Sequence, residues 1–82
     1  MANNIYKDLI YVVTFECSAS AEEVIAAFAS WAEAESFLFQ KAEEDRQLNG
    51  CFRIDYEQES VTCWLDKSEP EDKDIYRIRK TR

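Results

Sequence analysis

Histidine is absent from the sequence, and glycine and proline each occur only once. Without histidine the chain lacks the most common general base and a frequent metal ligand. A single glycine cannot form the glycine-rich loop that binds phosphate groups, and the sequence contains no Walker, Rossmann, G-x-S-x-G or H-E-x-x-H motif. We therefore expect a protein that is not an enzyme and that uses no cofactor and no metal.

The cysteines Cys17, Cys51 and Cys63 are odd in number and show no C-x-x-C spacing. This pattern fits neither a disulfide framework nor a zinc site, and it favours free thiols buried in strands of a cytoplasmic protein. The acidic run Asp66–Asp72 lacks the central glycine and the terminal glutamate of a calcium-binding EF-hand loop. The sequence has no apolar stretch long enough to span a bilayer and no signal-peptide pattern over Met1–Asp8.

Acidic side chains outnumber basic ones by seventeen to ten, which gives a net charge of -7. Most of such a surface repels free nucleic acid and anionic membranes, so a basic partner is the natural counterpart. All seventeen acidic and six of the basic side chains lie in residues 1–74, and the last eight positions add four basic ones. A chain of 82 residues predicts a single domain over residues 1–82 with a small core, for which homodimerisation would be unsurprising.

The first half of the chain predicts a strand followed by helix. Leu9–Cys17 is dense in β-branched and aromatic residues, which favours a central or first strand. Ser20–Glu23 matches a capping box, so a helix is expected over Ala21–Leu48, with Asn49 and Gly50 as its stop. An alternative makes Val24–Phe28 a strand, although its alanines and the flanking glutamates weaken that interpretation.

A second capping box at Ser30–Glu33 leaves open whether the helical segment is one long helix or two, broken near Ser30. Glu35 falls in the middle of the expected core face, and Phe37 lies off it, so that its exposure would be notable. At about 100° per residue, the apolar residues that share this face are Val24, Ile25, Phe28, Trp31, Leu38, Phe39 and Ala42.

The second half predicts three strands. Cys51–Glu57 alternates, with Phe52, Ile54 and Tyr56 on one face, and Gln58 and Glu59 connect it to a returning strand over Val61–Leu65. Asp66–Asp74 is a polar surface loop, and Ile75–Lys80 is a last strand, expected at an edge where its basic residues pair with the protein's own acids. The fold class is therefore α+β: an antiparallel sheet of about four strands, in the order β-α-β-β-β, with one long or broken helix on one face.

The acidic residues suggest a function. Carboxylates about 5 to 6 Å apart on a helix, or alternating along a strand, can imitate the phosphate spacing of a nucleic-acid strand and so occupy a basic groove. Each cluster taken singly is also consistent with a solvated face that keeps a small protein in solution. The residues expected to contact a partner are Glu43, Glu44 and Asp45 at the helix end, with Asp55, Glu57 and Glu59 on the hairpin.

The sequence Ser-Trp-Ala-Glu-Ala-Glu at residues 30–35, followed by Gly50 and Cys51–Tyr56, resembles a pattern in small domains of phage and plasmid proteins. Those domains have S-W-x-E-A-E near a helix start, then a glycine and an aromatic-rich hairpin. The resemblance implies an origin on a mobile element. By size, charge and setting the chain is similar in type to anti-CRISPR proteins and other inhibitors of bacterial defence. The implied partner is a basic protein or ribonucleoprotein effector in the host cytosol.

The C-terminal tail supports a competing hypothesis. Arg77, Arg79, Lys80 and Arg82, together with Tyr76, could touch nucleic acid directly. The protein would then be a small DNA-binding accessory or regulatory protein. The inhibitor hypothesis instead predicts no binding to free nucleic acid.

Overall fold

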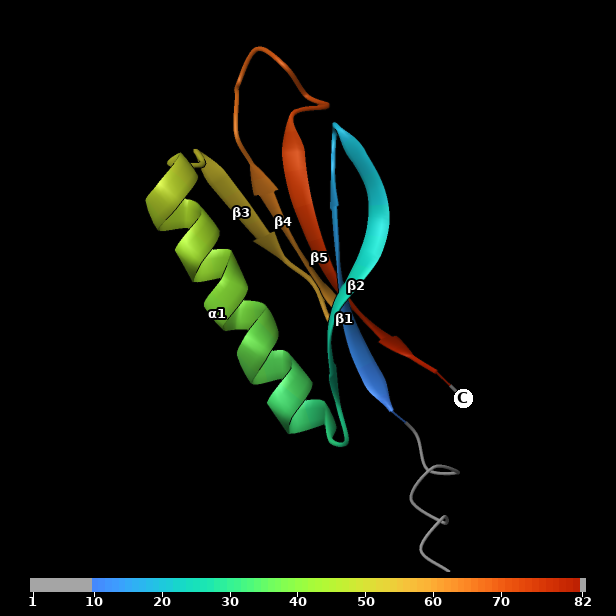
Figure 1. The fold of residues 1–82 in the computed structure, drawn as a ribbon. Coiled ribbons are helices and arrows are strands. Elements are labelled where there is room, and N and C mark those ends of the chain that lie inside the picture. Colours follow the sequence, from blue (N-terminus) through green and yellow to red (C-terminus); the bar gives the residue numbers. More distant parts are fainter. Residues whose placement is uncertain (1–9, 82) are drawn as a thin grey trace, which may run out of the picture.

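A five-stranded antiparallel sheet carries an α-helix on one face (Figure 1). The computed structural model describes residues 10–81, so Leu9 at the start of the predicted first strand lies outside the described residues. The predicted α+β class is confirmed, and the predicted order of elements is present with one further strand, β2. The elements are β1 (Tyr11–Cys17), β2 (Ser20–Phe28), α1 (Trp31–Asn49), β3 (Arg53–Tyr56), β4 (Ser60–Trp64) and β5 (Lys73–Lys80).

The strands are arranged in the order β2-β1-β5-β4-β3. The last strand, β5, pairs with β1 on one side and β4 on the other, so the prediction that it lies at an edge is wrong. Its alternation explains the central position: Tyr76 and Ile78 are buried beneath α1, while Arg77 and Arg79 point to the opposite face. The edges of the sheet are β2 and β3.

The helix predicted to begin at Ala21 begins ten residues later, because Ser20–Phe28 forms strand β2. The predicted alternative, a strand over Val24–Phe28, is therefore confirmed. β2 pairs antiparallel with β1, with register shifts that indicate β-bulges. Glu22, which the capping-box interpretation assigned to a helix start, instead accepts hydrogen bonds from Thr14 and Arg79 across the sheet.

Local signals fix both ends of α1. Ser30 is the N-cap, and its Oγ accepts a hydrogen bond from the backbone N–H of Glu33 at 3.2 Å, as the second capping box predicts. At the other end Gly50 adopts the left-handed conformation with φ of 63° and donates its N–H to the carbonyl of Arg46 at 2.9 Å. One unbroken helix therefore occupies Trp31–Asn49.

The face of α1 that packs on the sheet differs in part from the predicted face. Leu38 and Ala42 are buried as predicted, but Phe39 is 43% exposed. Phe37 is half-buried and packs against Phe28 with ring centroids 5.3 Å apart, so the prediction that it lies off the core is wrong. The buried face of α1 consists of Ala34, Leu38, Ala42 and Asp45, which follow one another at intervals of three or four residues.

Beyond α1, the predicted hairpin is confirmed: β3 and β4 pair with Ile54 opposite Cys63. Cys63 is buried, and this burial raises the pKa of its thiol to about 12. All three cysteines are free. The loop between β4 and β5 ends earlier than predicted, because Lys73 and Asp74 already belong to β5, and Asp74 is buried.

Candidate functional site

The predicted acidic residues at the end of α1 are paired with neighbours on the same helix. Glu43 accepts hydrogen bonds from Arg46 and Gln47, and the Arg46 guanidinium lowers the pKa of the Glu43 carboxyl. Glu44 accepts a hydrogen bond from Lys41 at 3.2 Å. These two carboxylates are half-exposed, but their charges are partly neutralised by cations one turn away.

Asp45, the third predicted contact residue on the helix, is only 4% exposed. Its Oδ2 accepts a hydrogen bond from the hydroxyl of Tyr76 at 3.1 Å, and its Oδ1 accepts one from the side-chain amide of Asn49 at 2.5 Å. The carboxylate therefore points into the protein, between α1 and β5. This burial does not suit contact with a partner, so the candidate surface does not include Asp45.

Of the three predicted contact residues on the hairpin, one is bound within the protein and two are exposed. Asp55 on β3 is half-buried, and its Oδ2 accepts hydrogen bonds from the Trp64 indole at 2.8 Å and from Arg53 at 3.0 Å. Glu57 and Glu59 are exposed at the turn between β3 and β4. The turn lies at the opposite end of β3 from the helix end, so the six predicted residues do not form one continuous surface (Figure 1).

A second exposed acidic group lies in the β4–β5 loop, which projects beyond the other end of β4 (Figure 1). Its exposed acids include Asp66, Glu69 and Glu71. The Asp66 carboxylate accepts hydrogen bonds from the backbone and hydroxyl of Ser68, which lower its pKa. The sequence shows these acids as a cluster, but nothing in the local pattern distinguishes an acid-rich contact loop from an ordinary solvated one.

The basic residues of β5 bind acids within the protein. Arg77 contacts Glu16 at 2.6 Å and Glu22 at 3.6 Å, and Arg79 donates to both carboxylate oxygens of Glu22 at 2.6 and 2.9 Å. The hydrogen bond from Arg79, followed by that from Thr14, lowers the pKa of Glu22 to about 2. The predicted pairing of these basic residues with the protein's own acids is thus confirmed for Arg77 and Arg79.

The other members of the proposed basic contact surface lie elsewhere. Tyr76 is buried against α1, on the opposite face of the sheet from Arg77 and Arg79. Lys80 is exposed at the end of β5, and Arg82 lies outside the described residues. Arg77, Arg79 and Tyr76 therefore do not share one surface.

Trp64 forms an aromatic centre on the open face of the sheet. Arg53 on β3 and Lys73 on β5 are its cross-strand neighbours, and their cationic groups lie 4.7 and 4.6 Å from the indole centroid. Because the two cations come from strands on either side, they flank the ring. The sandwich leaves little of the Trp64 ring free for stacking with a ligand.

A buried pair of carboxyl groups is the chemically most unusual feature. Asp74 on β5 is 8% exposed and lies against Asp45; burial, then the hydrogen bond and charge of Asp45, raises the pKa of Asp74 to about 7. The pair faces a cavity of about 150 Å³ that Phe15, Lys41 and Leu48 help to line. Ligand pockets usually measure roughly 300 to 1,000 Å³. The small volume indicates a structural polar contact between α1 and β5.

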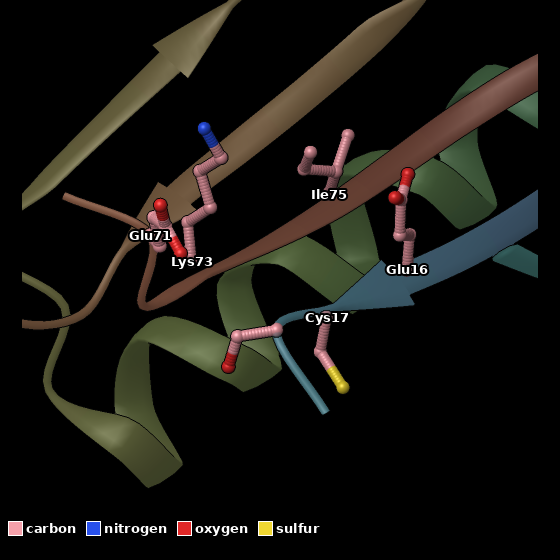
Figure 2. A pocket seen from close by; sticks show the side chains of 6 residues that line it. Glu16, Cys17, Glu71, Lys73 and Ile75 are labelled. Carbon is pink, nitrogen blue, oxygen red and sulfur yellow. The ribbon is translucent and has the colours of Figure 1, made fainter. Parts of the chain in front are cut away.

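A larger hollow of about 240 Å³ lies where β1 ends and β5 begins (Figure 2). Figure 2 shows the Cys17 thiol pointing to the opposite side from the side chains of Glu16 and Ile75. The Cys17 Sγ instead lies 3.3 Å from the Ser20 hydroxyl. These side chains do not converge on one point, so the hollow lacks the geometry of a nucleophile and its base.

Comparisons with known proteins assign no family: no family model matches the chain, and neither a curated protein nor a solved structure matches it significantly. Within residues 10–81 no cluster of three or more cysteine, aspartate or glutamate side chains could hold a metal ion. No helix in the same residues is long and apolar enough to cross a membrane. The charges and exposed side chains of the chain itself therefore carry the information about function.

Proposed function

We propose that this protein is a non-enzymatic inhibitor, of the kind that phages use against bacterial defence, which occupies a basic nucleic-acid groove on a host effector complex. A CRISPR effector is the first target to test, and the bacterial cytosol is the place of action. Four exposed acids are the principal contacts: Glu57 and Glu59 in the β3–β4 turn, with Glu69 and Glu71 in the β4–β5 loop.

The observation that carries the proposal is the contrast between paired and unpaired charges. None of these four glutamates forms an ion pair within residues 10–81, whereas Arg77 and Arg79 are both held by internal carboxylates. The exposed charge that remains available to a partner is therefore mainly negative. A negative surface of this kind attracts a basic groove and repels free nucleic acid.

The positions of the two acidic groups suit an elongated groove. They lie at opposite ends of β4, a strand of five residues. At about 3.3 Å per residue the strand alone spans about 17 Å, and the loop adds to this separation. One nucleic-acid strand carries a charge every 3.4 Å or so, so the two groups would replace phosphates at least about five nucleotides apart.

The test is affinity capture from a bacterial lysate, followed by mass spectrometry and by direct binding measurements on the purified partner. The wild type should retain a basic nucleic-acid-binding protein or complex. Glu57→Lys/Glu59→Lys and Glu69→Lys/Glu71→Lys should each weaken binding to that partner at least tenfold. Glu23→Lys/Glu33→Lys is the matched control, since it changes the net charge equally at exposed sites on β2 and α1.

Equal loss in the control would mean that net charge alone, rather than these two acidic groups, governs binding. Full binding by both test variants would refute acidic mimicry. A gel shift with free DNA tests the competing hypothesis that the protein binds DNA through its basic C-terminal residues. If the wild type shifts DNA at moderate salt and Lys80→Glu/Arg82→Glu does not, the protein is a DNA-binding accessory protein instead.

A further inference from the structure

The β3 edge of the sheet is unusually exposed on the side that carries the helix. α1 lies over β1, β4, β5 and β2, but its backbone makes no close approach to the backbone of β3. As a result Tyr56, on that side of the hairpin, is 59% exposed. Phe39 on α1 is 43% exposed and contacts Tyr56 edge-to-face, with centroids 5.7 Å apart. These two aromatic residues, here called the β3-edge patch, form an apolar surface beside an open strand.

The backbone of β3 is also available for pairing. β3 pairs only with β4 within residues 10–81, which leaves its other side open (Figure 1). Glu57 donates its N–H to the carbonyl of Ser60 at 2.8 Å, in continuation of the β3–β4 register. Because hydrogen-bonding direction alternates along an antiparallel strand, the backbone N–H and C=O groups of Ile54 and Tyr56 point away from β4.

The sequence of this edge is complementary to itself. If two copies of β3 pair antiparallel about Ile54, then Arg53 of one protomer lies opposite Asp55 of its partner, and Asp55 opposite Arg53. On the other face the two Ile54 residues meet at the centre. Opposite charges at directly opposed positions stabilise antiparallel strands, and the Arg53–Asp55 pair occurs twice about the two-fold axis.

The opposite edge of the sheet is less suited to pairing. β2 carries the register shifts against β1, and such bulges protect an edge from another strand. Its N-terminal half also presents Glu22 and Glu23 without a basic residue on the strand to oppose them. A second copy would therefore meet complementary groups at the β3 edge and would not meet them at the β2 edge.

We propose that this protein forms a two-fold symmetric dimer through antiparallel pairing of β3 with β3 in the register centred on Ile54, which joins the two sheets into one. The β3-edge patches of the two protomers become covered at this seam. The inference concerns self-association and does not depend on the partner proposed above. Since β3 has only four residues, the interface is small and the dimer is expected to be weak.

The test is sedimentation velocity over a concentration series from about 1 µM to 1 mM, made with charge-swap variants. Arg53→Asp places aspartates opposite each other at the seam, and Asp55→Arg places arginines opposite each other. The dissociation constant of each variant alone should be at least tenfold higher than that of the wild type. An equal mixture of the two variants should dimerise again, as a heterodimer. The double variant Arg53→Asp/Asp55→Arg should also recover dimerisation.

Recovery in the mixture also guards against misfolding, because a misfolded chain would not regain a specific partner. Glu23→Lys on β2 is the control and should leave dimerisation unchanged. A wild type that stays monomeric at the highest concentration overturns the proposal. So does a dimer that survives both single swaps, or one that is lost in the singles and not restored by mixing.

Discussion

Replacing Asp74 with asparagine should make the protein more stable at high pH and leave its stability unchanged at low pH. Asp74 is almost fully buried beside Asp45, and its pKa rises from 3.8 to about 7. Between these values the folded protein keeps a proton that the unfolded chain has released, so the free energy of unfolding falls as the pH rises. Above pH 7 Asp74 is ionised in the folded protein as well, so the whole free-energy cost of burying its charge lowers the stability. A change of about 3 in pKa corresponds to roughly 4 kcal/mol.

Asparagine resembles the protonated carboxyl group in shape and can still donate a hydrogen bond to Asp45. We therefore expect Asp74→Asn to exceed the wild type by about 2 to 4 kcal/mol at pH 8 and to match it near pH 4. Denaturant unfolding followed by the fluorescence of Trp31 and Trp64 measures this difference. Glu69→Gln in the exposed loop is the control and should show no such pH dependence. A difference between Asp74→Asn and the wild type that does not change between pH 4 and pH 8 would refute the reasoning.

Three further predictions use the same unfolding assay. Ser30→Ala removes the hydrogen bond to the Glu33 backbone and should cost about 1 kcal/mol; an unchanged stability would show that the cap is not needed. Gly50→Ala should cost about 1 kcal/mol through the backbone alone, since φ is 63° and nothing lies within 4 Å of an added Cβ; a gain would contradict this conformation. Glu22→Gln should cost about 1 kcal/mol at pH 7, because its lowered pKa stabilises the fold above pH 4.5 and this contribution is lost as the pH falls towards 2. A cost that persists at pH 2 would exclude the ion pair with Arg79 as its cause.

Local signals in the sequence predicted those parts of the fold that depend on neighbouring residues. The cap at Ser30, the stop at Gly50 and the β3–β4 hairpin each involve residues close together in the chain, and all three are present. Strand β2 pairs with its chain neighbour β1, and its Glu22 is also held by Arg79, which lies 57 positions along the chain. A capping box is a local pattern, and pairing with β1 overrides it.

The candidate site was predictable to a smaller extent for the same reason. The pairing of Glu43 with Arg46 and of Glu44 with Lys41 follows from helical spacing and could have been read from the sequence. Asp45 lies three positions after Ala42 and seven after Leu38, so helical spacing already placed it on the buried face; its charge was the reason to expect it at the surface. Asp74 precedes the predicted last strand but alternates in phase with Tyr76, and this was the available signal for its burial.

The most direct test of the proposed function is a competition between this protein and nucleic acid for the same effector. A labelled nucleic acid bound to the captured complex should be displaced by increasing amounts of the wild-type protein. The variant in which Glu57, Glu59, Glu69 and Glu71 are all changed to lysine should displace at least tenfold less well. Simultaneous binding of nucleic acid and wild-type protein to the effector would contradict the account.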